Sequence, residues 1–527
     1  MGKNTLVNSG GKNSRTKNTI LNFTSSIGGQ LITIIMQFVV RTVFIRTLGK
    51  SYLGINGLFS NILTMLSLAN MGVGTAIVYK LYKPISENNH QRIATLMHFY
   101  KTVYRFIGIA VAAIGVCLIP FLPYIIKDSG KLDSLGINMT FIFLLYLIQN
   151  VSSYLFFAYK SAIVSANQKD YLLNIIQYFF TFGLAVVHIV FLLIYPNFTV
   201  YVLLTIVEVI ARNCVNAHYA NKLYPYIKEK PSEKISKDEV KGIFKDCSAL
   251  FLYKLNDVVL KATDNIVISI FLGLEVVGLY SNYLILYNTI RLLIIKIFNA
   301  VSHSIGNLHA ENKGRHEYTI FKSVMLVTTI LASTAAVGLA VCSDELVNTW
   351  IGSDWIIPKP FSILIGVEIF TAAFRTILSK YRTIMGLFQQ AKLRPVFGMI
   401  INLVVSVALV KSWGICGVLV GTIVADWTTL MWYDPLVVYR VGFKGKYKPS
   451  DFFGSLALRG IVTVAVGVID YFICTNLFTG LGWISVIVHA IICGVTVPLA
   501  MLAVSYRTEE GKYLLGILTK FVKKIKK

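Results

Sequence analysis

Charged side chains inside long apolar segments are the residues of this sequence best placed to do chemistry. Residues three or four apart share one face of a helix. By that rule a wedge of about 80° holds four charged residues of alternating sign, Lys254, Asp257, Lys261 and Asp264. Charged groups are costly to bury, so each needs a partner, water or a functional reason. Lysine and arginine donors suit an anionic cargo, and guanidinium groups suit phosphate oxygens in particular.

Two sets of these residues form the candidate site. The cationic set is expected to contact an anionic substrate and consists of Arg41, Lys254, Lys261, Arg291 and Arg375. The acidic set offers candidate positions for a coupling ion, because burial can raise the pKa of a carboxyl into a useful range. Its members are Asp257, Asp264, Glu368 and Asp426. For any single acid, structural ion pairing is the preferred interpretation.

The elements that must position these residues are membrane-spanning helices. Of the 527 residues, 55% are hydrophobic and only 14% are charged, whereas a soluble domain is about a quarter charged. The composition therefore predicts an all-α polytopic membrane protein. A spanning helix needs about 20 mostly apolar residues, and fourteen segments qualify: 19–45, 53–79, 102–126, 139–164, 172–195, 198–221, 247–272, 276–301, 319–342, 358–385, 394–411, 413–437, 452–476 and 481–504.

The distribution of lysine and arginine predicts the orientation of these spans. With the N-terminus inside, cytoplasmic segments contain 35 of the 50 basic residues, the opposite side contains six, and nine fall within spans. The formal net charge of +25 is therefore mainly a topology signal, and no nucleic-acid partner is expected. Both termini are predicted to lie in the cytoplasm.

Some of the cations within spans have an acid nearby, and others lie close enough to the end of a span to reach the lipid headgroups. Glu208 lies four residues before Arg212, which predicts a helical ion pair. Arg105 and Arg459 lie near cytoplasmic ends of spans and are expected to reach the lipid headgroups. Polar stripes on the first two spans either line a hydrated cavity or hold helices together. The stripe on the second span consists of Asn56, Ser60, Thr64, Ser67 and Asn70.

The remaining cations predict a cavity with surplus positive charge. Pairing inside the wedge is an alternative that would neutralise its two lysines. Glu368 shares a helix face with Arg375, but seven residues correspond to about 10 Å along the axis, beyond direct contact. Four cations are thus left without an evident local acid: Arg41, Arg291, Lys296 and Arg375.

The first twelve spans divide into two similar halves at the polar segment 222–246. Each half begins with Leu-Gly and a second glycine five residues later, and the two junctions, at Gly49 and Gly273, are offset by 224 residues. An even number of spans per half predicts parallel repeats. The predicted regions are an N-lobe 1–221, a cytoplasmic linker 222–246, a C-lobe 247–440, extra helices 441–506 and a tail 507–527. The tail is either a basic amphipathic helix on anionic lipid or a disordered basic segment.

Several other functions are disfavoured. The sequence has no Walker A motif, and its cysteines and histidines are dispersed, so no cofactor or metal is expected. A glycan polymerase or transferase would need catalytic groups in substantial loops, and Asp344, Glu345 and Asp354 form no convincing pair. An organic-cation antiporter would favour acids and aromatic residues without competing cations. Translocation without covalent chemistry is the favoured interpretation.

The layout resembles the multidrug/oligosaccharidyl-lipid/polysaccharide (MOP) exporter superfamily. Thr263–Tyr283, TDNIVISIFLGLEVVGLYSNY, is similar to the start of the second half in polysaccharide transporters, and Arg46–Ile77 is similar to their first hairpin. The resemblance implies a MATE/MOP-like fold and a bacterial Wzx-type flippase in the cytoplasmic membrane. Its cargo would be an undecaprenyl-diphosphate-linked oligosaccharide for capsule, O-antigen or exopolysaccharide, moved by alternating access.

The resemblance also implies roles for residues and partners. By position Arg41, Lys254, Lys261 and Arg291 correspond to the cavity cations that engage the diphosphate, and the two extra helices correspond to a groove for the prenyl tail. Expected partners are membrane lipids and a glycan polymerase or assembly protein. A proton or sodium gradient, the membrane potential or consumption of the product would drive movement. A lipid II flippase and a multidrug antiporter are the alternatives.

Overall fold

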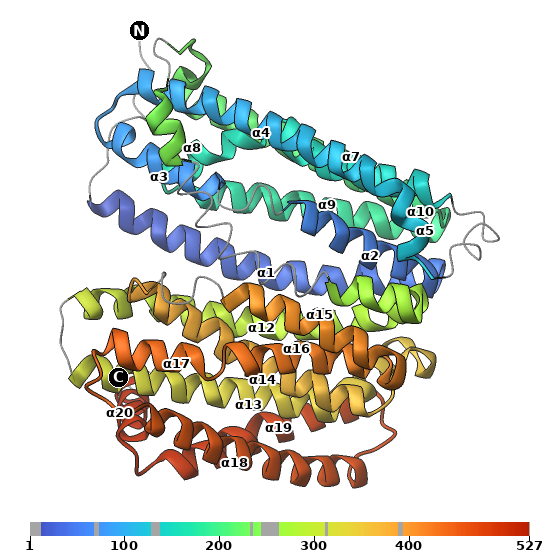
Figure 1. The fold of residues 1–527 in the computed structure, drawn as a ribbon, viewed down its shortest axis with the longest axis vertical. Coiled ribbons are helices and arrows are strands. Elements are labelled where there is room, and N and C mark those ends of the chain that lie inside the picture. The colour runs from blue at the N-terminus through green and yellow to red at the C-terminus, as the bar shows by residue number, and fades with distance from the viewer. Residues whose placement is uncertain are drawn as a thin grey trace. The chain divides into compact units, whose positions relative to one another are not determined.

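The computed structural model of the protein describes residues 12–67, 73–127, 138–231, 235–243, 263–310, 315–387 and 394–525. The regular elements in these ranges are helices, and each long helix lies alongside others of its own unit (Figure 1). The chain forms two compact units, Met1–Ala262 and Thr263–Lys527. The division into two six-helix lobes with a linker and two extra helices stays a prediction.

The first unit is built on helix pairs joined by short turns. An asparagine precedes each of α4, α7 and α10 and caps that helix. Its side-chain oxygen accepts a hydrogen bond from the backbone N–H three residues later, a common start signal for helices. Helix α1 packs against α9, and α7 packs against α4 and α10. The helices are α1 (Lys12–Leu48), α2 (Lys50–Leu66), α3 (Val73–Ser86), α4 (His90–Leu118), α5 (Leu122–Ile125), α7 (Met139–Leu155), α8 (Ser161–Ala166), α9 (Asp170–Ile194) and α10 (Phe198–Leu223).

The second unit has α13 and α14 packed against each other, and α19 and α20 also pack against α13. Its first described element is the short apolar helix Thr263–Leu272. The others are α12 (Leu274–Ala310), α13 (Arg315–Ile351), α14 (Pro360–Ile384), α15 (Arg394–Trp413), α16 (Ile415–Thr429), α17 (Tyr433–Val437), α18 (Pro449–Asn476), α19 (Trp483–Ser505) and α20 (Glu509–Ile525).

A tight hairpin joins α15 to α16, at the turn that the sequence predicts around Lys411 to Gly414. Gly414 has a φ of 57°, a left-handed conformation that glycine adopts readily. Farther along, a Cβ on Gly417 would lie 2.5 Å from the Leu409 carbonyl oxygen, and one on Gly421 would lie 2.1 Å from Ser406 Oγ. The two helices can approach this closely only because these positions are glycine.

Ten described helices are long and apolar enough to span a membrane, or eleven if the bent pair Met139–Leu155 and Ala158–Ala166 counts as one span. The all-α polytopic prediction is confirmed. Three of the fourteen predicted spans are not among these: 53–79 appears as α2 and α3, 247–272 is described only from Thr263, and 276–301 lies within α12. The total of fourteen stays a prediction.

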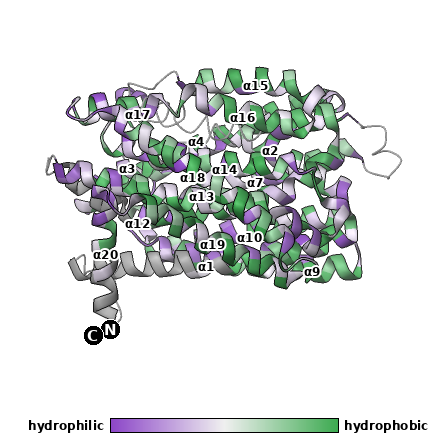
Figure 2. Cartoon of the chain, turned by 90° about the horizontal axis from the view of Figure 1, so that it is seen from below, coloured by the Kyte–Doolittle hydropathy of each residue, from purple (hydrophilic) through white to green (hydrophobic). Residues whose placement is uncertain are grey.

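Apolar residues predominate along many helices, which are largely green in Figure 2, and many of these residues are exposed. On α18, Ile461 and Val464 are each 67% exposed, and on α19 Ile491 and Leu499 are exposed to a similar degree. Such apolar surfaces suit lipid rather than water.

The two predicted glycine junctions have the same backbone geometry. Gly49, between α1 and α2, has a φ of 85°, and Gly273, just before α12, has a φ of 93°. Each glycine N–H donates to the carbonyl four residues earlier at 3.2 Å, and each glycine carbonyl accepts from the residue four later at 3.4 Å. Positive φ explains why both positions are glycine.

Candidate functional site

Arg375 on α14 forms a buried ionic network with two acids of the predicted set. Its Nη1 lies 2.6 Å from Asp426 Oδ2 on α16, and its Nη2 lies 3.7 Å from Glu368 Oε1 on α14. All three side chains are buried. The expectation that Arg375 lacks a nearby acid is therefore wrong. The contact with Glu368 shows that the two long side chains together span the axial separation of seven residues.

A cluster of oxygen-bearing side chains surrounds Asp264 close to this network. Thr422 Oγ1 donates to Asp264 Oδ2 at 3.2 Å, and Asn402 Nδ2 donates to Thr422 Oγ1 at 2.9 Å. One turn along α15 from Asn402, Ser406 Oγ donates to the Val418 carbonyl at 3.2 Å. The side chains of Asp264, Asn402, Ser406 and Thr422 are buried. We call these four residues and the Val418 carbonyl the oxygen cluster.

The oxygen cluster and the ionic network share helix α16. Thr422 and Asp426 are four residues apart, so they lie on one face of that helix. Trp427 Nε1 also donates to Thr371 Oγ1 at 3.0 Å, which ties α16 to α14. The site therefore draws on α14, α15, α16 and the helix Thr263–Leu272, all within the second unit.

Charge does not balance within this site. Asp264, Glu368 and Asp426 supply three carboxyl groups, whereas Arg375 supplies one guanidinium. When all three acids are ionised, their negative charges outnumber the Arg375 guanidinium by two, or by one when Arg291, which lies against α14 next to Arg375, is counted with it. A buried charge without compensation is costly. An excess of carboxyl groups is the opposite of the cation surplus that the sequence predicts around Arg375.

Sequence reasoning missed a second ion cluster farther along α14. Arg382 Nη1 lies 2.9 Å and Arg394 Nη1 lies 2.5 Å from Asp434 Oδ1 on α17, and Asp434 is fully buried. Arg382 lies seven residues after Arg375, hence on the same helix face. The spacing of seven residues indicates this shared face in the sequence. The lysine and arginine count that predicts the orientation, however, assigns Arg382 and Arg394 to a cytoplasmic segment.

The other predicted cations lie in different places. Arg291 on α12 approaches α14, where its Nη2 lies 3.5 Å from Thr376 Oγ1, beside Arg375 in the chain. Arg41 is half-buried on α1 in the first unit. Three predicted site residues fall outside the described residues: Lys254, Asp257 and Lys261.

Polar residues in the first unit hold helices together. Tyr146 on α7 donates to Asn56 on α2, and Asn150 Nδ2 donates to Ser67 Oγ at 2.9 Å. These contacts support the helix-packing interpretation of this polar stripe. The predicted Glu208–Arg212 pair, which lies on α10, is confirmed, with Arg212 Nε 2.7 Å from Glu208 Oε1.

Arg459 does not reach the headgroups as predicted. It is buried on α18, and its Nη2 lies 2.7 Å from Glu510 Oε1 on α20. The prediction was wrong because the sequence does not reveal that the tail helix returns to pack against α13 and brings an acid to Arg459.

Two of the acids considered for catalysis, Asp344 and Glu345, lie on α13 and not in a loop as predicted, and they contact side chains of other helices. Asp344 accepts hydrogen bonds from Tyr283 at 2.9 Å and Ser362 at 2.7 Å, and Glu345 Oε2 lies 2.6 Å from His489 Nδ1. Within the described ranges, no group of three or more histidine, cysteine, aspartate or glutamate residues is placed to hold a metal ion. These contacts position helices and loops of the second unit.

Comparisons with known proteins agree with this architecture. The profile of the polysaccharide biosynthesis protein family matches residues 43–360. The chain is similar in structure to the lipid II flippase MurJ in an inward closed conformation, with a TM-score of 0.66 and 14% identity over 92% of this chain and 99% of that chain. No curated protein matches the sequence.

Two conformations of a multidrug resistance MATE family transporter of the MOP superfamily are also similar. The inward-facing form has a TM-score of 0.58 and 12% identity over 79% of this chain and 96% of that chain. The outward-facing form has a TM-score of 0.55 and 12% identity over 82% of this chain and 97% of that chain. The predicted resemblance to the MOP superfamily is thus confirmed at the level of fold. The family match covers more than half of the chain, so this multi-pass membrane protein, which has the fold of MurJ and MATE transporters, belongs to the polysaccharide biosynthesis protein family.

Proposed function

We propose that the protein is a flippase that moves a polyprenyl-diphosphate-linked oligosaccharide across the bacterial cytoplasmic membrane by alternating access. Family membership supports a glycan as cargo, and similarity to a lipid II flippase over 92% of the chain supports a lipid-linked one. Both termini would lie in the cytoplasm, and a glycan polymerase or assembly protein would receive the product outside.

In this proposal, the cationic set engages the diphosphate. Guanidinium groups offer several N–H donors in a planar fork that matches phosphate oxygens. Arg291 is the member whose surroundings are best defined, since it lies against α14 beside the ionic network. Arg41 and the predicted residues Lys254 and Lys261 complete the set. Arg375 acts differently, because its contacts with Asp426 and Glu368 hold the network together.

The oxygen cluster would bind the coupling ion. Carboxylate, amide, hydroxyl and carbonyl oxygens are the ligands that small hard cations prefer. Asp264 is the acid at its centre, and its hydrogen bond with Thr422 places it one helical turn from Asp426. A sodium ion or a proton taken up here would offset the excess negative charge of the site and thereby link ion binding to the packing of α14, α15 and α16.

Charge reversal at Arg291 tests the cargo. Cells that depend on this protein for surface glycan should lose that glycan with Arg291→Glu and retain much of it with Arg291→Lys, while the amount of protein in the membrane stays constant. Lys83→Glu is a matched control, because Lys83 is exposed on α3. Normal glycan with Arg291→Glu would contradict the role of the cationic set.

Transport by proteoliposomes tests the coupling ion. With fluorescent lipid-linked oligosaccharide, Asp264→Asn should abolish the response of flipping to an imposed sodium or proton gradient. The gradient that stimulates the unmodified protein identifies the ion. An equal response of Asp264→Asn and unmodified protein would exclude the oxygen cluster as the coupling site.

Lipid II is the second candidate cargo, favoured by the fold similarity to MurJ. Rescue of cells depleted of their own lipid II flippase would favour this cargo. Failure to rescue, together with restored surface glycan in a glycan-transport mutant, would favour the oligosaccharide.

A further inference from the structure

An apolar groove lies in the second unit. Its volume is about 470 Å³, within the roughly 300–1,000 Å³ of ligand sites. Residues of four helices line it. Most belong to α12 and α13, α14 contributes Ile377, and α20 contributes Tyr513, Leu514 and Ile517. Ile297 and Ile517 are each 48% exposed, so the groove opens to the surface.

The chemistry of the groove suits an alkyl chain. Its side chains are apolar except for three residues with hydroxyl groups, among them Ser323 and Thr328. The Ser323 hydroxyl donates to the Thr319 carbonyl and the Thr328 hydroxyl to the Val324 carbonyl, each at 2.8 Å. These two hydroxyls already have acceptors on their own helix, so the wall offers little to a polar ligand. Filling the groove with hydrocarbon removes apolar surface from contact with water.

Cations lie at the rim of the groove. Lys380 Nζ on α14 lies 5.7 Å from the ring centroid of Phe298, which lines the groove. Lys512 is exposed on α20 next to Tyr513, whose ring lies 6.1 Å from that of His316. Lys380 Nζ also donates a hydrogen bond to Asn299. The two lysines give the surroundings of the groove positive charge, which favours a negatively charged headgroup.

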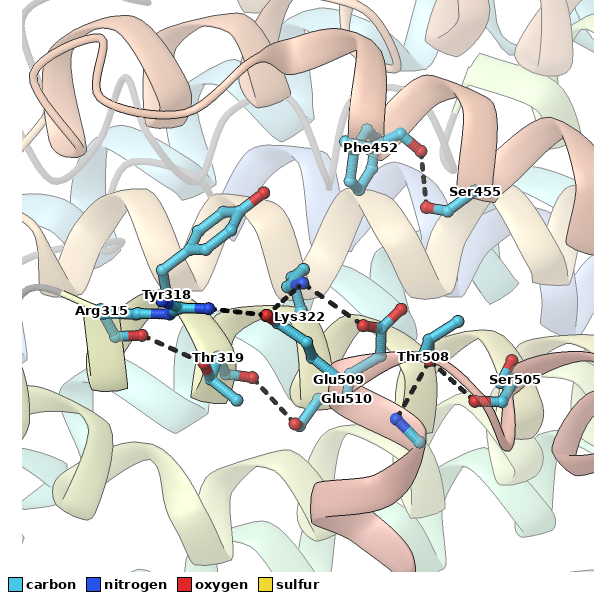
Figure 3. Close-up of polar contacts among 12 residues, drawn as sticks. Arg315, Tyr318, Thr319, Lys322, Phe452, Ser455, Ser505, Thr508, Glu509 and Glu510 are labelled. Carbon is cyan, nitrogen blue, oxygen red and sulfur yellow. Dashed lines mark hydrogen bonds and ion pairs between the residues drawn. The ribbon is translucent and has the colours of Figure 1, made fainter.

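Ion pairs hold the first turn of α20 in place, and Figure 3 shows those of Glu509 with Arg315 and Lys322. Glu509 contacts Arg315 and Lys322 of α13, each at 3.0 Å, and Glu510 contacts Arg459 of α18 at 2.7 Å. Glu510 and Arg459 are buried, so this second contact is shielded from water. The tail helix is thereby fixed to two other helices at its first turn, directly before the residues that face the groove.

We propose that this groove binds one acyl chain of an anionic phospholipid, with the headgroup phosphate at Lys380 and Lys512. The apolar wall selects the hydrocarbon, and the two lysines select the negative charge. The lipid completes the packing of α20 against α12, α13 and α14. This proposal concerns a structural lipid and is independent of the transported cargo.

Lipid retention by the full-length protein tests the chain site. Delipidated protein in detergent is titrated with phosphatidylglycerol and observed by native mass spectrometry. Val327→Trp, which fills the groove, should lower binding at least tenfold. Ile461→Trp is the matched control, because Ile461 is exposed on α18 outside the groove. Ile297→Trp, at a half-exposed position, serves as a second filling variant if Val327→Trp does not fold. Equal binding by a folded filling variant and the control would overturn the proposal.

The headgroup and the lipid class are tested separately. Phosphatidylglycerol should bind several-fold more tightly than phosphatidylcholine with the same chains, and Lys380→Gln with Lys512→Gln should remove that preference without changing phosphatidylcholine binding. Glycerol phosphate alone should not compete. An unchanged preference in the double variant would overturn the headgroup contact. Displacement of phosphatidylglycerol by an equimolar amount of undecaprenyl phosphate would overturn the choice of a phospholipid.

Discussion

The two units differ in the kind of polar contacts that they bury between their helices. In the described part of the first unit, the contacts between helices are mostly neutral, as in the Tyr146–Asn56 and Asn150–Ser67 pairs. Its ion pairs, such as Arg92 with Glu239, are partly exposed. The second unit instead buries the Arg375 network and the Arg382–Asp434 pair.

This difference indicates in which unit the stability of helix contacts can depend on a bound ion. A neutral hydrogen bond between membrane helices contributes about 0.6 kcal/mol on average and changes little with ionic conditions. A buried network of Arg375 with two acids changes its energy when a cation enters or leaves its surroundings. In the proposed function the coupling step would therefore belong to the second unit, and the described polar contacts of the first unit would be structural.

Removing one partner from the ionic network should have the largest effect. Asp426→Ala leaves the Arg375 guanidinium buried without its 2.6 Å contact, which is expected to lower the free energy of unfolding by about 3–5 kcal/mol. Denaturation in detergent measures this loss. Asp451→Ala on α18 is the matched control, because Asp451 is exposed. A loss below about 1 kcal/mol would show that the network is not the main electrostatic difference between the units.

Changing the oxygen cluster should affect transport more than folding. Thr422→Val removes the hydroxyl that donates to Asp264 and is expected to lower ion-driven flipping about tenfold, since one hydrogen bond to a charged group contributes about 1.5–3 kcal/mol. Thr422→Ser keeps the hydroxyl and should retain most of the activity. Flipping in proteoliposomes measures both. Equal ion-driven flipping by Thr422→Val and by the unmodified protein would show that the cluster has no part in the coupling step.

The corresponding change in the first unit should be mild. Asn56→Ala removes the acceptor of the Tyr146 hydroxyl and is expected to cost about 0.6 kcal/mol of stability, with flipping and its ion dependence unchanged. Denaturation and the proteoliposome assay provide the two readings. Loss of ion dependence in Asn56→Ala would mean that coupling extends into the first unit, against the comparison drawn above.

The smallest effect is expected at the tail helix. Hydrogen bonds from Lys322, and then from Arg315, hold the pKa of Glu509 below its usual value of 4.5. Because the folded pKa lies below that of the unfolded chain, the carboxylate stabilises the docked helix at pH values above 4.5, and this stabilisation is lost as pH falls through the folded pKa. Limited proteolysis of the tail should increase slightly in that acidic range. Glu509→Gln should show the increase at neutral pH and little further change on acidification.

The sequence predicted well what depends on local patterns. Leu-Gly at the two junctions indicated tight turns, and both Gly49 and Gly273 have positive φ. The spacing of Glu208 and Arg212 predicted their pair, which is confirmed. Long apolar segments predicted helices because a backbone in lipid must satisfy its own hydrogen bonds. Local spacing is enough for such features.

The candidate site depends on contacts between helices, which spacing alone does not determine. Asp264 and Asp426 were selected as buried acids, but their partners Thr422 and Arg375 lie on other helices. Asn402 and Ser406 gave no signal, since such residues are common in spans. The Glu510–Arg459 contact was missed for the same reason: it joins residues 51 positions apart.

The close approach of α15 and α16 constrains how the second unit moves. Because Gly417 and Gly421 leave no room for a Cβ, sliding either helix by one residue would press Val418 or Thr422 into a gap shaped for glycine. The hairpin is therefore expected to pivot as one rigid body rather than shear. The side chains of Asn402, Ser406 and Thr422 would then keep their mutual spacing, and any change in the oxygen cluster would come from Asp264, which lies on the separate helix Thr263–Leu272.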